Sequence, residues 1–132
     1  MNDHESVKDL LQREALEVEP VRQARLVAAV YRKNRLICVA PNLYKSHPLQ
    51  ARFGRVPEAI FLHAEVNAIR LSLREVEIED FPSLTMYVGR VLKNGSLALA
   101  KPCAGCRSAI QAFGIRKTFY TDYSGNLVRL TD

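Results

Sequence analysis

Two short motifs that lie far apart in the sequence restrict how this chain can fold. The first is H-A-E at residues 63–65, and the second is P-C-A-G-C at residues 102–106. One imidazole and two thiolates supply three ligands of a tetrahedral zinc site and leave its fourth position for water. We therefore expect a fold in which His63, Cys103 and Cys106 meet around one metal ion.

The second motif is a weak signal by itself, because a C-x-x-C pair also suits a thioredoxin-like redox pair or half of a zinc ribbon. Its combination with an upstream H-x-E motif and a preceding Pro102 makes chance a poor explanation. In a reducing compartment, such a cysteine pair favours metal or redox chemistry over a structural disulfide.

Hydrophobic periodicity predicts a layered α/β sandwich with the element order α-β-β-α-β-α-β-β. The helices are expected at residues 5–18, 63–76 and 102–113, and the strands at 25–31, 35–40, 84–92, 116–121 and 127–130. The last two strands should be antiparallel, because the turn at residues 124–126 is too short for a parallel crossover. Residues 41–62 are expected to be irregular, since their prolines and Gly54 discourage regular structure.

Length and composition are those of an ordinary globular domain. The 132 residues are expected to form a single domain spanning residues 1–132. Because no apolar run is long enough to cross a bilayer and no signal peptide is visible, we expect a cytoplasmic protein. The net charge of +5 favours anionic partners such as nucleotides or nucleic acid.

The position of both motifs at predicted helix starts separates the roles of their residues. The exposed N–H groups and the positive end of the helix dipole favour thiolate over thiol there. Residues two apart on a helix project in different directions, so we do not expect Glu65 to bind the metal together with His63. Zinc can lower the pKa of a bound water to about 7, and Glu65 is better suited to take a proton from that water.

Together, the motifs at residues 63–65 and 102–106 resemble the H-x-E…P-C-x-x-C signature of the zinc-dependent cytidine deaminase superfamily. The resemblance implies a three-layer α/β/α sandwich with a mixed five-stranded sheet. It also implies zinc as the cofactor, with His63, Cys103 and Cys106 as its ligands.

The activity implied by the resemblance is hydrolytic conversion of a cytosine base to uracil on a nucleoside or nucleotide. A zinc-bound hydroxide, formed with the help of Glu65, would attack C4 of the base, and ammonia would leave. Asn42 follows the second strand, where the superfamily often places a substrate-binding asparagine, although a turn-former after Pro41 is about as good an interpretation. Ala64, between His63 and Glu65, is the other implied substrate contact.

The size of the substrate stays open, because two features of the resemblance point in different directions. A short C-terminal hairpin and a compact length are similar to the free-nucleoside cytidine deaminases, which usually place a cysteine at the position of His63. Histidine there is more typical of deaminases that act on deoxycytidylate, tRNA adenosine or polynucleotides.

Two other functions remain alternatives. A deaminase of cytosine or adenine in single-stranded DNA or RNA would use the basic loop that contains Lys45, Arg52 and Arg55, whose interleaved aromatic residues suit base stacking. The simpler interpretation of this loop is a solvated segment that its aromatics anchor to the core. A catalytically inactive, zinc-stabilised binding module would not need Glu65.

The resemblance further implies a homodimer or homotetramer, because free-nucleoside relatives commonly complete their pockets across subunits.

Two further residues with reactive side chains are expected to have no chemical role. Cys38 lies in the middle of a predicted strand, where a free thiol behaves as a small hydrophobe, so we expect it to pack in the core. His47 has no spaced partner and is expected to be a solvated loop residue.

Overall fold

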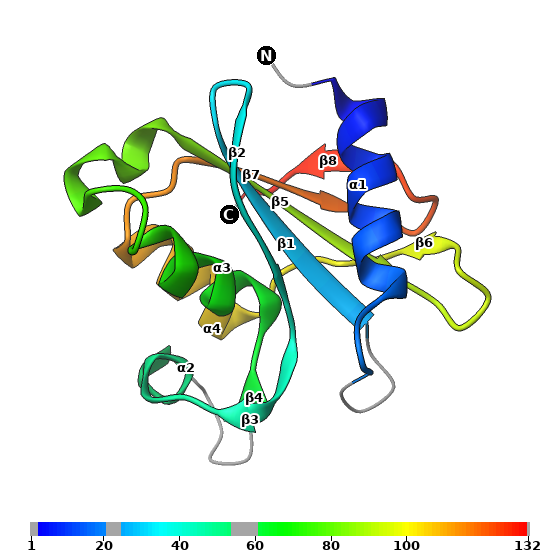
Figure 1. The fold of residues 1–132 in the computed structure, drawn as a ribbon, viewed down its shortest axis with the longest axis horizontal. Helices are drawn as coiled ribbons and strands as arrows, with labels where there is room; N and C mark the ends of the chain where they lie inside the picture. The colour runs from blue at the N-terminus through cyan, green and yellow to red at the C-terminus, as the bar shows by residue number, and fades with distance from the viewer. Residues whose placement is uncertain (1–2, 21–24, 54–60, 132) are drawn as a thin grey trace.

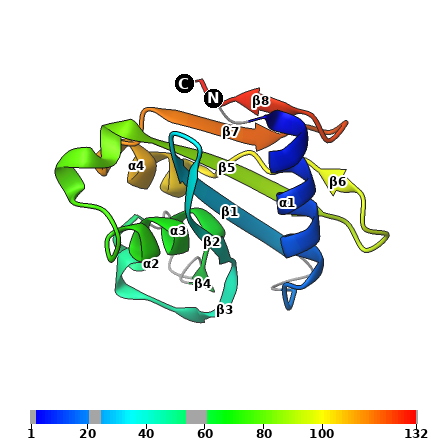
Figure 2. The same ribbon diagram turned by 45° about the horizontal axis from the view of Figure 1, so that its top comes forward.

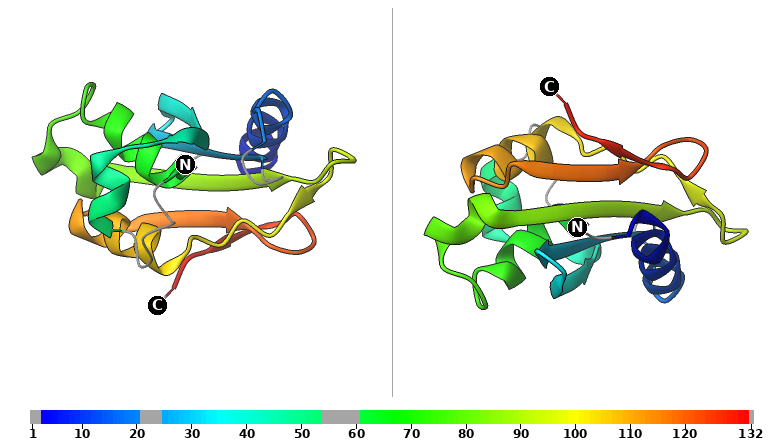
Figure 3. Two further views of the ribbon diagram at one scale, coloured as in Figure 1. Left: turned by 90° about the horizontal axis from the view of Figure 1, so that it is seen from below. Right: turned by 90° about the horizontal axis from the view of Figure 1, so that it is seen from above.

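The computed structural model describes residues 3–20, 25–53 and 61–131, and a mixed β-sheet forms its centre (Figure 1). The main strands are β1 Arg25–Arg32, β2 Arg35–Pro41, β5 Leu84–Val91, β7 Lys117–Thr121 and β8 Leu127–Arg129. They lie in the order β2-β1-β5-β7-β8, and Figure 2 shows β2 and β8 at the two edges. The strands β5 and β7 are parallel (Figure 3), and the other neighbouring pairs in this order are antiparallel.

Helices cover both faces of the sheet, which confirms the predicted three-layer sandwich. The helix α1 His4–Leu16 packs on one face, and α3 Ala64–Ser72 and α4 Ala104–Ala112 lie on the other (Figure 1). A short strand, β6 Leu97–Ala98, pairs with the end of β5, so the sheet of the described residues has six strands rather than the expected five. The last two strands are antiparallel, as predicted. No helix in the described part of the chain is long and apolar enough to cross a membrane.

The sheet separates two hydrophobic cores, because successive side chains of a strand point to opposite faces. In β1, Val27 and Ala29 pack towards α1, whereas Ala28 and Val30 pack towards α3 and α4. Cys38 packs against the second of these cores, and its Sγ lies 3.5 Å from the carbonyl oxygen of Ala68. The prediction that Cys38 is a core residue is confirmed.

The segment that follows β2 is more regular than expected. The strands β3 Leu43–Ser46 and β4 Phe61–Leu62 pair in antiparallel fashion, and α2 Pro48–Phe53 lies between them in the sequence. The prediction of irregular structure is therefore wrong for these residues, while Gly54, Arg55 and Pro57 lie outside the described residues. The reason is that Pro48 occupies the first position of α2, where a helix does not need a backbone N–H.

His47 caps this unexpected helix. Its Nδ1 accepts a hydrogen bond from the backbone N–H of Leu49 at 3.0 Å, and its carbonyl oxygen accepts one from the N–H of Ala51 at 3.1 Å. His47 is half-buried, so the prediction of a solvated loop residue is wrong. Its imidazole instead satisfies an N–H group that the first turn of a helix leaves without a partner.

The remaining helices begin close to where the sequence places them. The carboxylate of Asp3 accepts a hydrogen bond from the N–H of Glu5 and caps α1. Helix α3 ends at Ser72, and a 3-10 helix, η1 Ile78–Ser83, leads from there into β5.

Gly89 allows α1 to approach the sheet closely. It lies opposite Val27 in the register of β5 and β1, on the face that α1 covers, and a Cβ at this position would lie 2.9 Å from Cβ of Leu11. We expect Gly89→Ala to lower the free energy of unfolding by about 1–3 kcal/mol, the usual cost of overpacking a core. Chemical denaturation measures this change. Because the nearest atom is Cβ of Leu11, which alanine would keep, the penalty should be much smaller in a Leu11→Gly background, and an equal penalty in both backgrounds would contradict this contact.

Candidate metal centre

The two sequence motifs meet where α3 and α4 begin. His63 is the residue that precedes α3, Cys103 is the residue that precedes α4, and Cys106 lies in the first turn of α4. Nδ1 of His63 lies 3.2 Å from Sγ of Cys106 and 3.6 Å from Sγ of Cys103. All three ligand atoms lie within 4.8 Å of one another, and this is the one such group of His, Cys, Asp or Glu side chains among the described residues. The structure therefore brings together the three residues that the sequence singles out.

The spacing of these atoms fits a zinc ion. With Zn–S and Zn–N bonds of about 2.3 and 2.0 Å, a tetrahedral site needs about 3.5 Å between nitrogen and sulfur. The distances of 3.2 and 3.6 Å lie on either side of this value. A zinc ion would thus need only small shifts of these side chains to bind Nδ1 of His63 and both sulfurs.

The two thiols differ in their affinity for a proton. The hydrogen bond with the side chain of Cys106, together with one from His63, lowers the pKa of Cys103 to about 3. The same hydrogen bond with Cys103, together with burial, holds the pKa of Cys106 well above its usual value. The hydrogen bond with Cys103 raises the pKa of His63. A divalent cation among these groups would favour two thiolates and a neutral imidazole, because only those forms bind metal.

Glu65 lies in the first turn of α3, next to the cluster but outside the group of three ligands. Its side chain is 3% exposed and interacts with the thiol of Cys106. Burial is the main reason that the pKa of Glu65 is raised. A carboxyl group that is buried beside possible metal ligands, without being one of them, is well placed to hold and transfer a proton.

Buried polar residues that the sequence analysis missed hold the start of α3 in place. The backbone N–H of His63 donates a hydrogen bond to Oε1 of Gln50 at 3.0 Å, and Gln50 is 1% exposed. Asn67 donates from Nδ2 to the carbonyl oxygen of Pro41 at 2.9 Å, which ties α3 to the end of β2. No local pattern marks Gln50 for this role, because its contact with His63 depends on the unpredicted helix α2.

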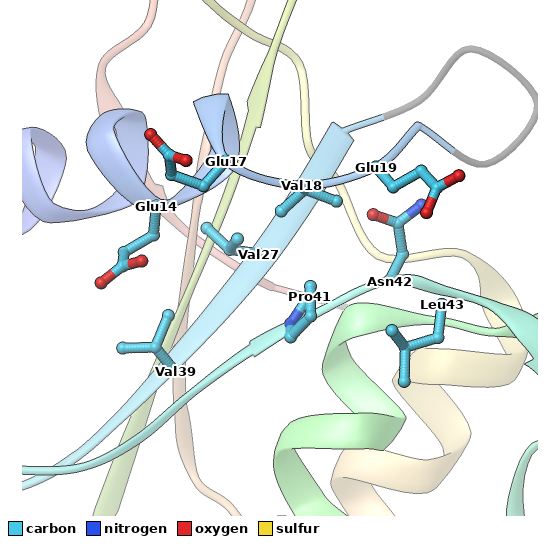
Figure 4. Close-up of a pocket in the computed structure, with 9 residues that line it drawn as sticks. All are labelled: Glu14, Glu17, Val18, Glu19, Val27, Val39, Pro41, Asn42 and Leu43. Atoms are coloured by element: carbon cyan, nitrogen blue, oxygen red, sulfur yellow. The ribbon is translucent and has the colours of Figure 1, made fainter.

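The two implied substrate contacts have different surroundings. Ala64 is the first residue of α3, and its buried methyl group belongs to the core below α3 and α4. Asn42 lines a cavity of about 340 Å³ between the end of α1 and the strands β1 and β2 (Figure 4), and none of the three metal-centre residues lines this cavity. Oδ1 of Asn42 accepts a hydrogen bond from the N–H of Leu26 at 3.0 Å, so part of the carboxamide supports the start of β1.

Comparison with known proteins identifies the class to which this fold and this site belong. A family model described as the zinc-binding region of cytidine and deoxycytidylate deaminases matches residues 1–122. The chain therefore belongs to this family of zinc-binding deaminases. The family's zinc-binding character agrees with the cluster of His63, Cys103 and Cys106, which could hold zinc.

The fold is also similar to that of a solved structure, the dCMP deaminase from the cyanophage S-TIM5 in its apo form. The TM-score is 0.60, and the similarity covers 94% of this chain and 87% of the phage protein. The two sequences are 19% identical, so this similarity shows the fold alone. No curated protein matches this chain in sequence.

Removing one sulfur ligand should abolish tight zinc binding. We expect the purified wild-type protein to hold one zinc ion per chain, measured by elemental analysis, and Cys106→Ser to hold much less. The physical reason is that a serine hydroxyl is a far poorer zinc ligand than a thiolate. Cys38→Ser is the matched control, since Cys38 contacts Ala68 on the sheet-facing side of α3 and should not alter the zinc content. Equal zinc contents in all three proteins would contradict the assignment of Cys106.

Gln50 should raise the affinity for zinc without touching the ion. Gln50→Leu leaves the buried N–H of His63 without its acceptor, and we expect the zinc dissociation constant to rise about 10-fold or more, as for other residues that orient a metal ligand. Competition with a chelator measures this constant. Gln12→Leu is the control, because Gln12 makes a comparable hydrogen bond to Gly95. That variant should lose some stability and keep its zinc affinity, and identical affinities for both variants would refute this role of Gln50.

Proposed function

We propose that this chain is a zinc-dependent hydrolase that converts a cytosine base to uracil on a nucleoside or nucleotide, with release of ammonia. The observation that carries the proposal is the buried carboxyl group of Glu65 beside a cluster of zinc-type ligands. A purely structural zinc site would not need this group, and burying a carboxyl group costs free energy. Membership in a family of cytidine and deoxycytidylate deaminases supports the same reaction.

His63, Cys103 and Cys106 would hold the zinc ion, and three protein ligands are the number that catalytic zinc sites use. When bound, zinc supplies Lewis-acid activation of a water molecule by lowering its pKa. Glu65 would take a proton from the attacking water and transfer it to N3 of the base as the bond between C4 and the oxygen forms. Glu65 then passes the second proton from the new hydroxyl group to the exocyclic nitrogen, so that the C4–N bond breaks and ammonia leaves.

We also propose the substrate contacts that the family motif implies. Ala64 lies between His63 and Glu65 in the sequence, so its backbone is next to the reacting atoms. Asn42 follows β2, and the hydrogen bond from the N–H of Leu26 to its Oδ1 fixes the orientation of the carboxamide.

Glu65→Gln tests the proposed proton transfer. The variant keeps the shape of the side chain but cannot accept the proton, so we expect turnover to fall about 10²- to 10⁴-fold. Its zinc content should stay that of the wild-type protein. Ammonia release from cytidine, deoxycytidine, dCMP, adenosine and a single-stranded oligonucleotide measures turnover, and Glu77→Gln is a control at an exposed carboxylate.

The outcomes of this experiment separate the possible functions. Turnover that survives Glu65→Gln would contradict the proposed mechanism. A zinc-loaded wild-type protein that releases no ammonia from any of these substrates would favour a zinc-stabilised binding module.

A deaminase of single-stranded DNA or RNA is the second candidate. Lys45 in β3 and Arg52 in α2 are exposed, and the guanidinium of Arg52 lies 5.1 Å from the ring centroid of Phe53. Oligonucleotide turnover that falls steeply as salt is added would favour this candidate, because phosphate contacts release counterions. Turnover of mononucleosides or mononucleotides alone would exclude it.

We further propose that the protein forms a homodimer or homotetramer, as the resemblance to free-nucleoside deaminases implies. Light scattering on the zinc-loaded protein measures the mass of the particle. A particle with the mass of one chain would contradict this proposal.

A further inference from the structure

The guanidinium of Arg90 lacks a hydrogen-bond partner at one buried nitrogen. It is half-buried in β5, and its Nε atom is buried without a hydrogen-bond partner. Among the described residues, no carboxylate forms an ion pair with it. Leaving a buried N–H group without an acceptor is unfavourable, and on a charged side chain it calls for an explanation such as a bound ion or ligand.

Arg90 lies on the face of the sheet that carries the metal centre. Met86 and Val88 precede it in β5 at intervals of two residues, and both belong to the core that also contains Cys106 and Ala64. Since side chains two apart on a strand share a face, Arg90 points to the same side as these residues.

Arg90 also lies at the end of the sheet where α3 begins. It pairs with Leu26 of β1, and the N–H of Leu26 donates to Asn42 at the end of β2. The first turn of α3 is tied to the same strand end through the hydrogen bond from Asn67 to the carbonyl oxygen of Pro41.

On its other side, Arg90 is next to β6, which precedes the segment that contains Cys103 and Cys106. Arg90 pairs with Ala98 of β6, and the chain runs from Ala98 through Pro102 directly to Cys103. Arg90 therefore stands between the two segments that deliver the metal-binding residues, on their side of the sheet.

We propose that Arg90 binds a phosphate group of the substrate, so that the enzyme acts on a nucleotide in preference to a free nucleoside. This inference rests on the proposed deaminase function. A guanidinium presents several donors in one plane, which match phosphate oxygens in geometry and charge. The phosphate is either the monoester of a mononucleotide or a phosphodiester of a single strand, since both offer the same anionic oxygens.

Arg25 provides a matched control. Its Nε is buried without a hydrogen-bond partner as well, and it lies on the strand next to Arg90. Its register partner is Val91, which packs in the core below α1, so Arg25 belongs to the opposite face. Replacing Arg25 removes the same charge at the same end of the sheet, but away from the metal centre.

The experiment compares kcat/KM for deoxycytidine, dCMP and a short cytosine-containing oligonucleotide in the zinc-loaded wild type, Arg90→Gln, Arg90→Lys and Arg25→Gln. We expect Arg90→Gln to lower kcat/KM for a phosphate-bearing substrate about 10- to 100-fold, mainly through KM, as loss of a charge-assisted hydrogen bond implies. The value for deoxycytidine should be unchanged. Arg90→Lys should restore part of the loss, and Arg25→Gln should behave like the wild type. A loss confined to dCMP identifies the monoester, and one confined to the oligonucleotide identifies the phosphodiester.

A binding measurement separates failure of this inference from failure of the proposed function. The products dUMP and deoxyuridine are added to each protein, and the midpoint of thermal unfolding is recorded. Stabilisation by dUMP over deoxyuridine that is lost in Arg90→Gln supports the phosphate site even if the wild type shows no turnover. Equal losses with deoxycytidine and dCMP, or equal stabilisation by both products in the wild type, would overturn it. If Arg90→Gln does not fold, Arg90→Lys decides by the same comparison.

Discussion

The candidate metal centre depends on holding the first turns of α3 and α4 together, because a zinc ion needs its ligands within a few ångströms of one centre. His63 precedes one helix, and Cys103 precedes the other. The sheet makes this meeting possible. Since β5 and β7 are parallel, the chain has to cross between their opposite ends, and α4 is part of that crossover. Helix α3 packs beside it on the same face.

Bringing two helix starts together concentrates polar groups in a part of the molecule that is largely shielded from water. Glu65, Gln50 and Asn67 are all buried there. Gln50 accepts a hydrogen bond from the backbone N–H of His63, and Asn67 donates one to the carbonyl oxygen of Pro41 at the end of β2. These hydrogen bonds offset the free-energy cost of burying the two side chains. Glu65 is different, because its burial raises its pKa without a comparable structural gain. The proton-transfer role that we propose for Glu65 would account for this cost.

The elements that the sequence predicts well have local causes. The apolar side chains of α1 recur at helical spacing and pack in the core between α1 and the sheet. The strands β1, β2, β5 and β7 are predicted by short apolar runs in the sequence. The missed elements depend on other parts of the chain. Helix α2 is short. In the sequence Pro48 indicates a break in regular structure, but in the structure it is the first residue of α2. The two residues of β6 form a strand only because the end of β5 offers them backbone partners.

The sequence by itself predicted the chemistry of the candidate metal centre. Imidazole, thiol and carboxyl groups in two spaced motifs indicate zinc ligands and a separate proton carrier, because ligand preference is a property of the side chain. Only the tertiary structure decided how the other polar residues are placed relative to that centre. Gln50 reaches His63 through an unexpected helix, Oδ1 of Asn42 accepts the N–H of Leu26, and Arg90 faces the metal side through the register of β5. A shift of one residue in that register would move Arg90 to the opposite face, and no local pattern in the sequence specifies it.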